Sequence, residues 1–126
     1  MAPKRPVKVK QSIAKLRGVD RERAMHAEAL VNDGWGREPA ELVAFVVYPL
    51  DDDVETSSAF ASEIGSLSMD AAAIAESASS GAAVHAAAMA VHAFRSVAES
   101  HQHAYYLSRF DRLLVDVPSI EARFGD

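Results

Sequence analysis

The chain has no cysteine among its 126 residues. This absence excludes disulfide frameworks, thiolate metal sites and cysteine nucleophiles together, and it fits a reducing cytosol. A long apolar run is also missing, since the most apolar stretch, residues 81–94, is interrupted by His85 and His92. A bilayer span needs roughly 20 uninterrupted apolar residues, and no apolar run of secretory length follows the basic start. We therefore expect a cytoplasmic protein with no membrane helix and no signal peptide.

Recognisable catalytic motifs are missing as well. The serines form no Gly-x-Ser-x-Gly elbow. Asp51-Asp52-Asp53 lacks the spaced oxygen ligands and the glycine of a calcium loop, and is typical of a solvated acidic turn. Gly34-Trp35-Gly36-Arg37 lacks the strand and spacing of a phosphate-binding loop. We predict a protein that is not an enzyme and has no cofactor, with a small helical enzyme as an open alternative.

The histidines do not have the spacing of a metal site. His85, His92 and Glu99 are seven residues apart, which places them about 10 Å apart along a straight helix. Ligands on one helix must be three or four residues apart, and only Glu99 and His103 meet that requirement. We therefore predict no metal site. We expect His85 and His92 to be partly buried with hydrogen-bond partners, and Glu99 and His103 to form an ordinary helix pair. A small helical metalloprotein is the alternative.

Charge is distributed unevenly along the chain. The formal net charge is -5, but residues 1–23 hold eight basic side chains against Asp20 and Glu22. The remaining 103 residues hold five basic and sixteen acidic side chains, a balance of -11. Such asymmetry indicates a basic segment that seeks an anionic partner, nucleic acid first among them. The alternative is that a basic terminus has no specific role.

Proline, glycine and capping residues divide the chain into expected elements. The first ten residues contain two prolines and four basic side chains, so we expect a basic arm over residues 1–10 and a helical domain over residues 11–126. A short helix is expected over residues 11–17, before Gly18. Asp20 is a plausible N-cap for a second helix that ends at Asn32. Gly34 would follow this helix end, and Trp35 would fold back over it as a core plug.

The run Leu42–Tyr48 leaves two interpretations open. Its β-branched and aromatic residues are typical of a strand, but a lone strand would have nothing to pair with. Pro39 also suits the first turn of a helix. We therefore favour a buried helix over residues 38–48, which Pro49 ends.

The rest of the chain has a helical period. Phe60, Ile64 and Leu67 recur at helical spacing. We expect Ser68 to cap a new helix over residues 69–79, Ser80 to cap another, and Pro118 to end a last one. Twelve of the 23 residues from 71 to 93 are alanine, which lets helix axes approach closely. The sum is an all-α fold, a single compact bundle of five to seven helices.

A polar and aromatic cluster precedes the last helix. His101, His103, Tyr105 and Tyr106 could stack on bases while nearby arginines contact phosphates, or they could be amphipathic groups at a helix boundary, which we favour. The predicted nucleic-acid contacts are Lys4, Arg5, Lys8, Lys10, Lys15, Arg17, Arg21 and Arg23, with Arg109 and Arg112 as a second candidate patch.

A cysteine-free helical domain with a basic N-terminal segment, alanine-rich helices and no catalytic set resembles the helical small subunits of multi-subunit CRISPR effector complexes, those of the type IV branch in particular. The resemblance is one of overall profile, and no residue is carried over by identity. It implies a non-catalytic bundle stacked in several copies along a guide-RNA filament, with basic residues facing the displaced or target DNA strand. Its partners would be RNA or single-stranded DNA and neighbouring subunits. The acidic body departs from this profile, so most of its surface would face protein or solvent. A protein–protein adaptor or a homo-oligomer without nucleic acid is the alternative.

Overall fold

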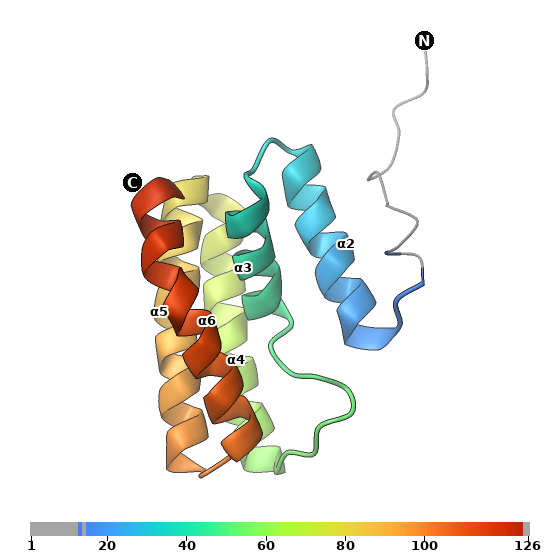
Figure 1. Cartoon of the computed structure of the whole chain (residues 1–126), viewed down its shortest axis with the longest axis vertical. Coiled ribbons are helices and arrows are strands. Elements are labelled where there is room, and N and C mark those ends of the chain that lie inside the picture. Colours follow the sequence, from blue (N-terminus) through green and yellow to red (C-terminus); the bar gives the residue numbers. More distant parts are fainter. Residues whose placement is uncertain (1–12, 14, 125–126) are drawn as a thin grey trace.

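The computed structural model describes residue 13 and residues 15–124, and in this part the chain is helical without a strand (Figure 1). The five helices are α2 (Gly18–Asn32), α3 (Arg37–Val47), α4 (Ser58–Ser77), α5 (Ser80–Ser100) and α6 (Ala104–Phe124). This architecture confirms the predicted all-α bundle of five to seven helices. The expected arm over residues 1–10 lies outside the described residues, as do residues 11, 12 and 14 of the helix expected over residues 11–17. Residues 15–17 are described and form a turn and extended chain instead of helix, so the expected helix does not reach Arg17.

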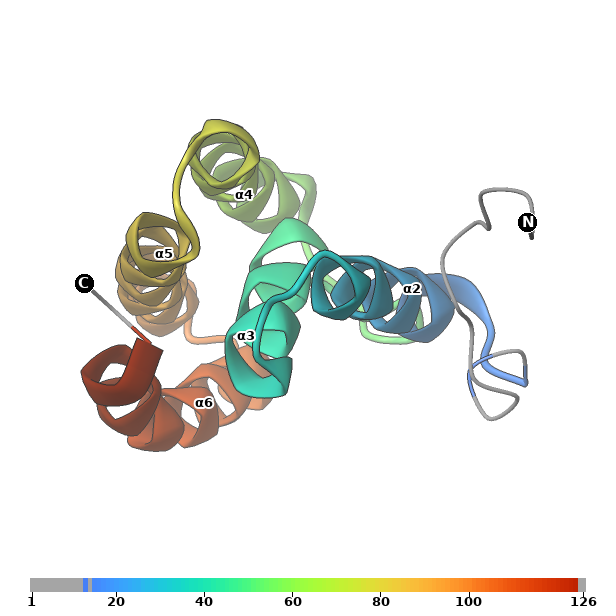
Figure 2. The ribbon, with the colours of Figure 1, turned by 90° about the horizontal axis from the view of Figure 1, so that it is seen from above.

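The short helix α3 is the centre of the bundle. It packs against each of the other four helices, while α5 also packs against α4 and α6. Figure 2 shows α4, α5 and α6 arranged in an arc around α3, with α2 on the remaining side. Among the described helices, α2 packs against α3 alone. It is therefore the helix with the fewest partners.

Burial on all sides explains why α3 has the composition of a strand. Leu42, Val43 and Val46 are each at most 2 % exposed because neighbours cover every face of the helix over residues 42–46, whereas Arg37, Glu38 and Glu41 before them are exposed. A segment in such a place has no polar stripe, so its apolar run does not show a helical period. The structure decides the question that the sequence left open over Leu42–Tyr48 in favour of a helix.

A chain of aromatic rings runs through the core. Tyr106 lies between Phe60 and Phe110, with ring centroids 5.5 and 5.6 Å away. Phe110 in turn contacts Phe94 and Phe45, at 5.5 and 6.1 Å. These rings come from α3, α4, α5 and α6, and offset or edge contacts of this kind add to the stability from burial alone. Tyr106 is therefore a fully buried core residue, whereas the sequence predicted an amphipathic group at a helix boundary.

Two of the predicted serine caps are wrong. Ser79, rather than Ser80, caps α5 by accepting the Ala82 N–H at 3.2 Å. Ser68 starts no helix. It lies buried within α4, which continues into the alanine-rich run, and its hydroxyl donates to the Val47 carbonyl at 3.1 Å. This bond satisfies a carbonyl at the end of α3 that the helix itself leaves without a partner.

The first described helix begins earlier than predicted. It starts at Gly18, and Asp20 lies in its first turn rather than at the N-cap position. Gly18 has φ +54°, a left-handed conformation that favours glycine. The Asp52 carboxylate, from the loop after α3, accepts the Val19 N–H at 2.7 Å. A residue distant in sequence thus replaces the local cap, so the sequence signal pointed to the wrong aspartate.

The other end of this helix follows the prediction. Gly34 has φ +103° beyond the last turn, and the Trp35 N–H donates to the Leu30 carbonyl at 3.0 Å. The indole is partly buried and packs against Ala27, Ala40 and their neighbours. This placement confirms the expected plug.

Pro118 does not end the last helix. It occupies an exposed position inside α6, which continues to Phe124. Val117 and Ile120, on either side of the proline, are buried in the core and hold both halves of the helix in place. Tertiary packing therefore overrides the local cost of a proline in a helix. Within residues 15–124, no helix has the length and apolar character that a bilayer span requires.

Candidate functional site

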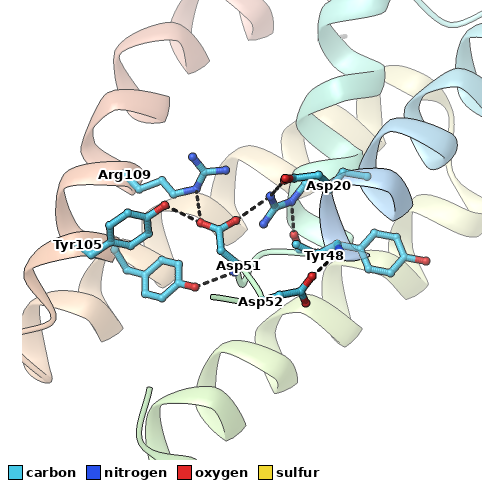
Figure 3. A network of polar contacts seen from close by, with 9 residues as sticks. Asp20, Tyr48, Asp51, Asp52, Tyr105 and Arg109 are labelled. Atoms are coloured by element: carbon cyan, nitrogen blue, oxygen red, sulfur yellow. Dashed lines mark hydrogen bonds and ion pairs between the residues drawn. The ribbon is translucent and has the colours of Figure 1, made fainter. Parts of the chain in front are cut away.

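Asp51 is the centre of a polar network where the loop after α3 meets α2 and α6 (Figure 3). Its side chain is 12 % exposed. The carboxylate accepts hydrogen bonds from Arg23 Nη1 at 2.8 Å and from the Tyr105 hydroxyl at 2.6 Å. Arg109 Nε lies 3.5 Å from the same carboxylate, and the Asp51 N–H donates to the Tyr106 hydroxyl at 2.7 Å. The acidic turn is therefore structured at Asp51, where the sequence predicted a solvated one.

The two arginines of this network share an aromatic partner. The guanidinium carbons of Arg23 and Arg109 lie 5.2 and 5.1 Å from the centre of the Phe45 ring. Arg23 Nε also donates to the Tyr48 carbonyl at 2.6 Å, and Asp20 lies 3.5 Å from its Nη1. Cations over an aromatic face are stabilised by the ring quadrupole. Both predicted nucleic-acid contacts are thus engaged within the protein.

The network shifts the pKa values of Asp51 and Tyr105. Burial raises the pKa of Asp51, but the hydrogen bonds from Tyr105 and Arg23 and the charge of Arg109 outweigh it, so the pKa lies below its ordinary value. The hydrogen bond to Asp51, together with burial, raises the pKa of Tyr105. An ionised acceptor with a protonated donor is a stable pair rather than a proton-transfer pair. We infer that the network holds α2 and α6 against the end of α3.

The other predicted nucleic-acid contacts differ from Arg23 and Arg109 in their exposure and ion pairing. Lys15, Arg17 and Arg21 are exposed and make no ion pair within the described part of the chain. Arg112 is exposed too, but Arg109 turns toward Asp51, so the two do not form one patch. Four further predicted contacts lie outside the described residues, namely Lys4, Arg5, Lys8 and Lys10.

The exposure and the partners of the histidines differ from those predicted. His85 and His92 are exposed rather than partly buried, and His85 Nδ1 lies 3.2 Å from a Glu121 carboxylate oxygen. Glu99 pairs with Arg95 at 3.1 Å and not with His103. The reason is that α5 ends at Ser100 and Gln102 has φ +54°, so Glu99 and His103 do not share a helix.

His101 and His103 instead attach the turn between α5 and α6 to the start of α4. His101 Nε2 lies 2.5 Å from a Glu63 carboxylate oxygen, and His103 Nε2 lies 2.9 Å from the Glu55 carbonyl oxygen. The His103 ring also stacks on Phe60, with centroids 5.0 Å apart. Among the described residues, no three His, Cys, Asp or Glu side chains are grouped as a metal site would require.

A groove of about 820 Å³ lies between α2 and α6, with α3 at its base. Leu42 and Phe45 of α3 and Leu113 of α6 provide apolar lining. The charged lining consists of five carboxylates against two guanidinium groups, from Asp20, Glu28, Glu38, Glu41, Asp116, Arg23 and Arg37. Ile13 and Leu16 from before α2 also line the groove. The sequence did not predict this surface because its residues come from three separate helices and from the segment that precedes them.

Comparison of the chain with protein-family models, curated proteins and solved structures gives no match.

Proposed function

We propose that the chain is a non-catalytic helical subunit of a nucleoprotein assembly, and that the cations before and at the start of α2 contact the nucleic-acid backbone. The observation that carries this proposal is the position of Lys15, Arg17 and Arg21. All three are exposed, and none has an ion-pair partner among the described residues. They continue a basic sequence that begins at Lys4.

The charge distribution supports one direction of approach. Arg17 and Arg21 are four residues apart, and the Arg21 N–H donates to the Arg17 carbonyl at 3.4 Å, so they lie one turn apart. The body beyond residue 23 is strongly acidic and repels phosphates. A nucleic acid would therefore contact this end of the molecule, leaving the acidic helices to solvent or neighbouring subunits.

The small subunit of an RNA-guided CRISPR effector complex is the particular assembly that we propose, because the overall profile of the chain resembles that class. In such an assembly several copies would follow one guide RNA, and each copy needs only a few phosphate contacts. The acidic helices, which depart from the profile of that class, would then face neighbouring subunits or solvent.

Binding of a labelled single-stranded RNA or DNA, measured by fluorescence anisotropy at several salt concentrations, tests the proposal. Arg17→Gln should weaken binding and lower the salt slope by about 0.7 if that residue contacts one phosphate of a single strand. Arg123→Gln is the matched control, because it removes an exposed cation on α6 that is not among the predicted contacts. No binding by the wild type, a salt-independent affinity, or equal losses in the two variants would remove the proposed role.

A protein–protein adaptor is the second candidate, and the groove between α2 and α6 favours it. An open apolar surface between helices is a common peptide-binding site. The two functions are separated by nuclease treatment of a purified assembly. An adaptor keeps its partner after digestion, whereas a subunit attached through nucleic acid loses it.

A further inference from the structure

We propose that the groove between α2, α3 and α6 binds a positively charged amphipathic helix of a partner protein. This inference does not depend on the nucleic-acid role, and it specifies the partner chemistry of the adaptor candidate. It is based on the shape of the groove, its apolar base and the sign of its charged lining.

The shape suits two to three turns of helix. The lining residues extend over positions 20–28 of α2, 37–45 of α3 and 113–120 of α6. At a rise of 1.5 Å per residue, each stretch is about 12 Å long. The groove is open to solvent rather than an enclosed cavity. Because α2 and α6 pack on α3 but not on each other, a groove remains between them, while the α3 side chains at its base are nearly covered, with Leu42 2 % and Phe45 9 % exposed.

The base of the groove provides an apolar seat. Its partly exposed apolar residues are Leu16, Ala24 of α2 and Leu113 of α6, and the buried Ile13, Leu42 and Phe45 also line it. Alanine in a wall allows the axis of an incoming helix to approach closely. A helix with apolar residues at i, i+3 or i+4 and i+7 would place them along this seat.

The charged lining selects a cationic partner. Arg23 is tied to Asp51 at 2.8 Å, and Arg37 is tied to Glu28 at 2.7 Å. Glu41 and Asp116 are exposed and make no ion pair within the described residues. Lysine or arginine beside the apolar stripe of the ligand would complement these two carboxylates. The same carboxylates disfavour nucleic acid in the groove, since they would repel phosphates.

The test uses the full-length chain and a fluorescein-labelled 14-residue peptide of leucine and lysine, with the leucines at helical spacing. Glu41→Lys combined with Asp116→Lys reverses two charges in the groove. Asp70→Lys combined with Glu76→Lys makes the same change in net charge on exposed positions of α4. We expect the groove variant to weaken peptide binding at least tenfold and the α4 variant to change it less than twofold. A peptide with serine in place of leucine should bind at least tenfold more weakly to the wild type.

Circular dichroism first establishes that both variants are folded, which is expected because all four substituted side chains are exposed. Equal losses in the two variants would show attraction to overall charge and overturn the proposal. Tenfold tighter peptide binding by Lys8→Ala combined with Lys10→Ala would assign the groove to the chain's own N-terminal segment. A concentration-dependent dimer lost in the groove variant would assign it to a second copy. Either result would overturn the proposal that a partner helix binds in the groove. Arg17→Gln should leave peptide binding unchanged, so failure here is distinct from failure of the nucleic-acid proposal.

Discussion

Replacing Asp51 with alanine removes the one carboxylate that accepts hydrogen bonds from α2 and α6 at the end of α3. Arg23 and Tyr105 lose an acceptor, at 2.8 and 2.6 Å, and Arg109 loses its nearby negative charge. Both guanidinium groups then remain over the Phe45 ring with no carboxylate between them. We expect Asp51→Ala to destabilise the fold and to loosen α2 first, because α2 packs on α3 alone.

The expected magnitude follows from burial. Hydrogen bonds to a charged group contribute about 1.5–3 kcal/mol each, and removing one partner of a fully buried pair costs about 3–5 kcal/mol. The Arg23 and Asp51 side chains are each 12 % exposed, but Tyr105 and Arg109 are more open to water. We therefore expect a loss of about 3 kcal/mol in the free energy of unfolding, toward the low end of the buried range.

Urea unfolding followed by circular dichroism measures this loss. Asp53→Ala is the matched control, since Asp53 belongs to the same acidic turn but is exposed and makes no hydrogen bond or ion pair in the described structure. It should change the unfolding free energy by less than about 0.5 kcal/mol. Equal effects of the two substitutions would refute the structural role of Asp51.

The same network predicts a pH dependence. The pKa of Asp51 in the folded chain lies below its ordinary value because its hydrogen-bond and charge partners outweigh burial. Its stabilising contribution is therefore complete above the unfolded value of about 4 and is lost as pH falls through the folded pKa. The difference in unfolding free energy between wild type and Asp51→Asn should be constant from about pH 7 to 5 and shrink below about pH 4. A difference that grows on acidification would contradict this assignment.

Three further substitutions test the corrected helix boundaries by thermal and urea unfolding. Ser68→Ala should lower the free energy of unfolding by about 1–2 kcal/mol, because a partly buried carbonyl at the end of α3 loses its donor. Ser66→Ala, at an exposed position of the same helix, should change it by less than about 0.5 kcal/mol. Gly18→Ala should lower the free energy of unfolding by more than about 1 kcal/mol, since φ is +54° and an added Cβ would collide with the Asp52 carboxylate. An unchanged free energy of unfolding would mean that α2 starts elsewhere. Pro118→Ala should raise the free energy of unfolding, by up to about 3 kcal/mol, by restoring a helix hydrogen bond at an exposed position. A loss of stability would show that the proline conformation is needed there.

Much of the fold could be predicted from the sequence because helix formation is largely local. The spacing of Phe60 and Ile64 and the left-handed glycine after α2 were each read from neighbouring residues and confirmed. Leu42–Tyr48 could only be favoured as a helix, because a helix buried on all sides shows no period. The conformation of this segment depends on the helices that pack around it, and a local sequence pattern does not reveal them.

The cap of α5 differs from the prediction by one residue within a local contact, Ser79 instead of Ser80. The other boundaries that failed are those where a distant residue competes with a local signal. Asp52 caps α2 in place of Asp20, and Ser68 bonds the end of α3 instead of starting a helix. Pro118 stays within α6 because packing on both sides of it outweighs its local cost. Each of these other exceptions involves a contact between residues far apart in the sequence or between separate helices.

The sequence by itself determined the helical class and the segregation of positive charge to the first 23 residues, since composition and short-range periodicity carry both. Only the tertiary structure decided which cations are available. Arg23 and Arg109 meet at Asp51 through a fold that brings α2, the loop after α3 and α6 together, whereas Arg17 and Arg21 remain exposed. The groove beside them arises in the same way, because a surface shared by three helices has no counterpart in the linear order of residues.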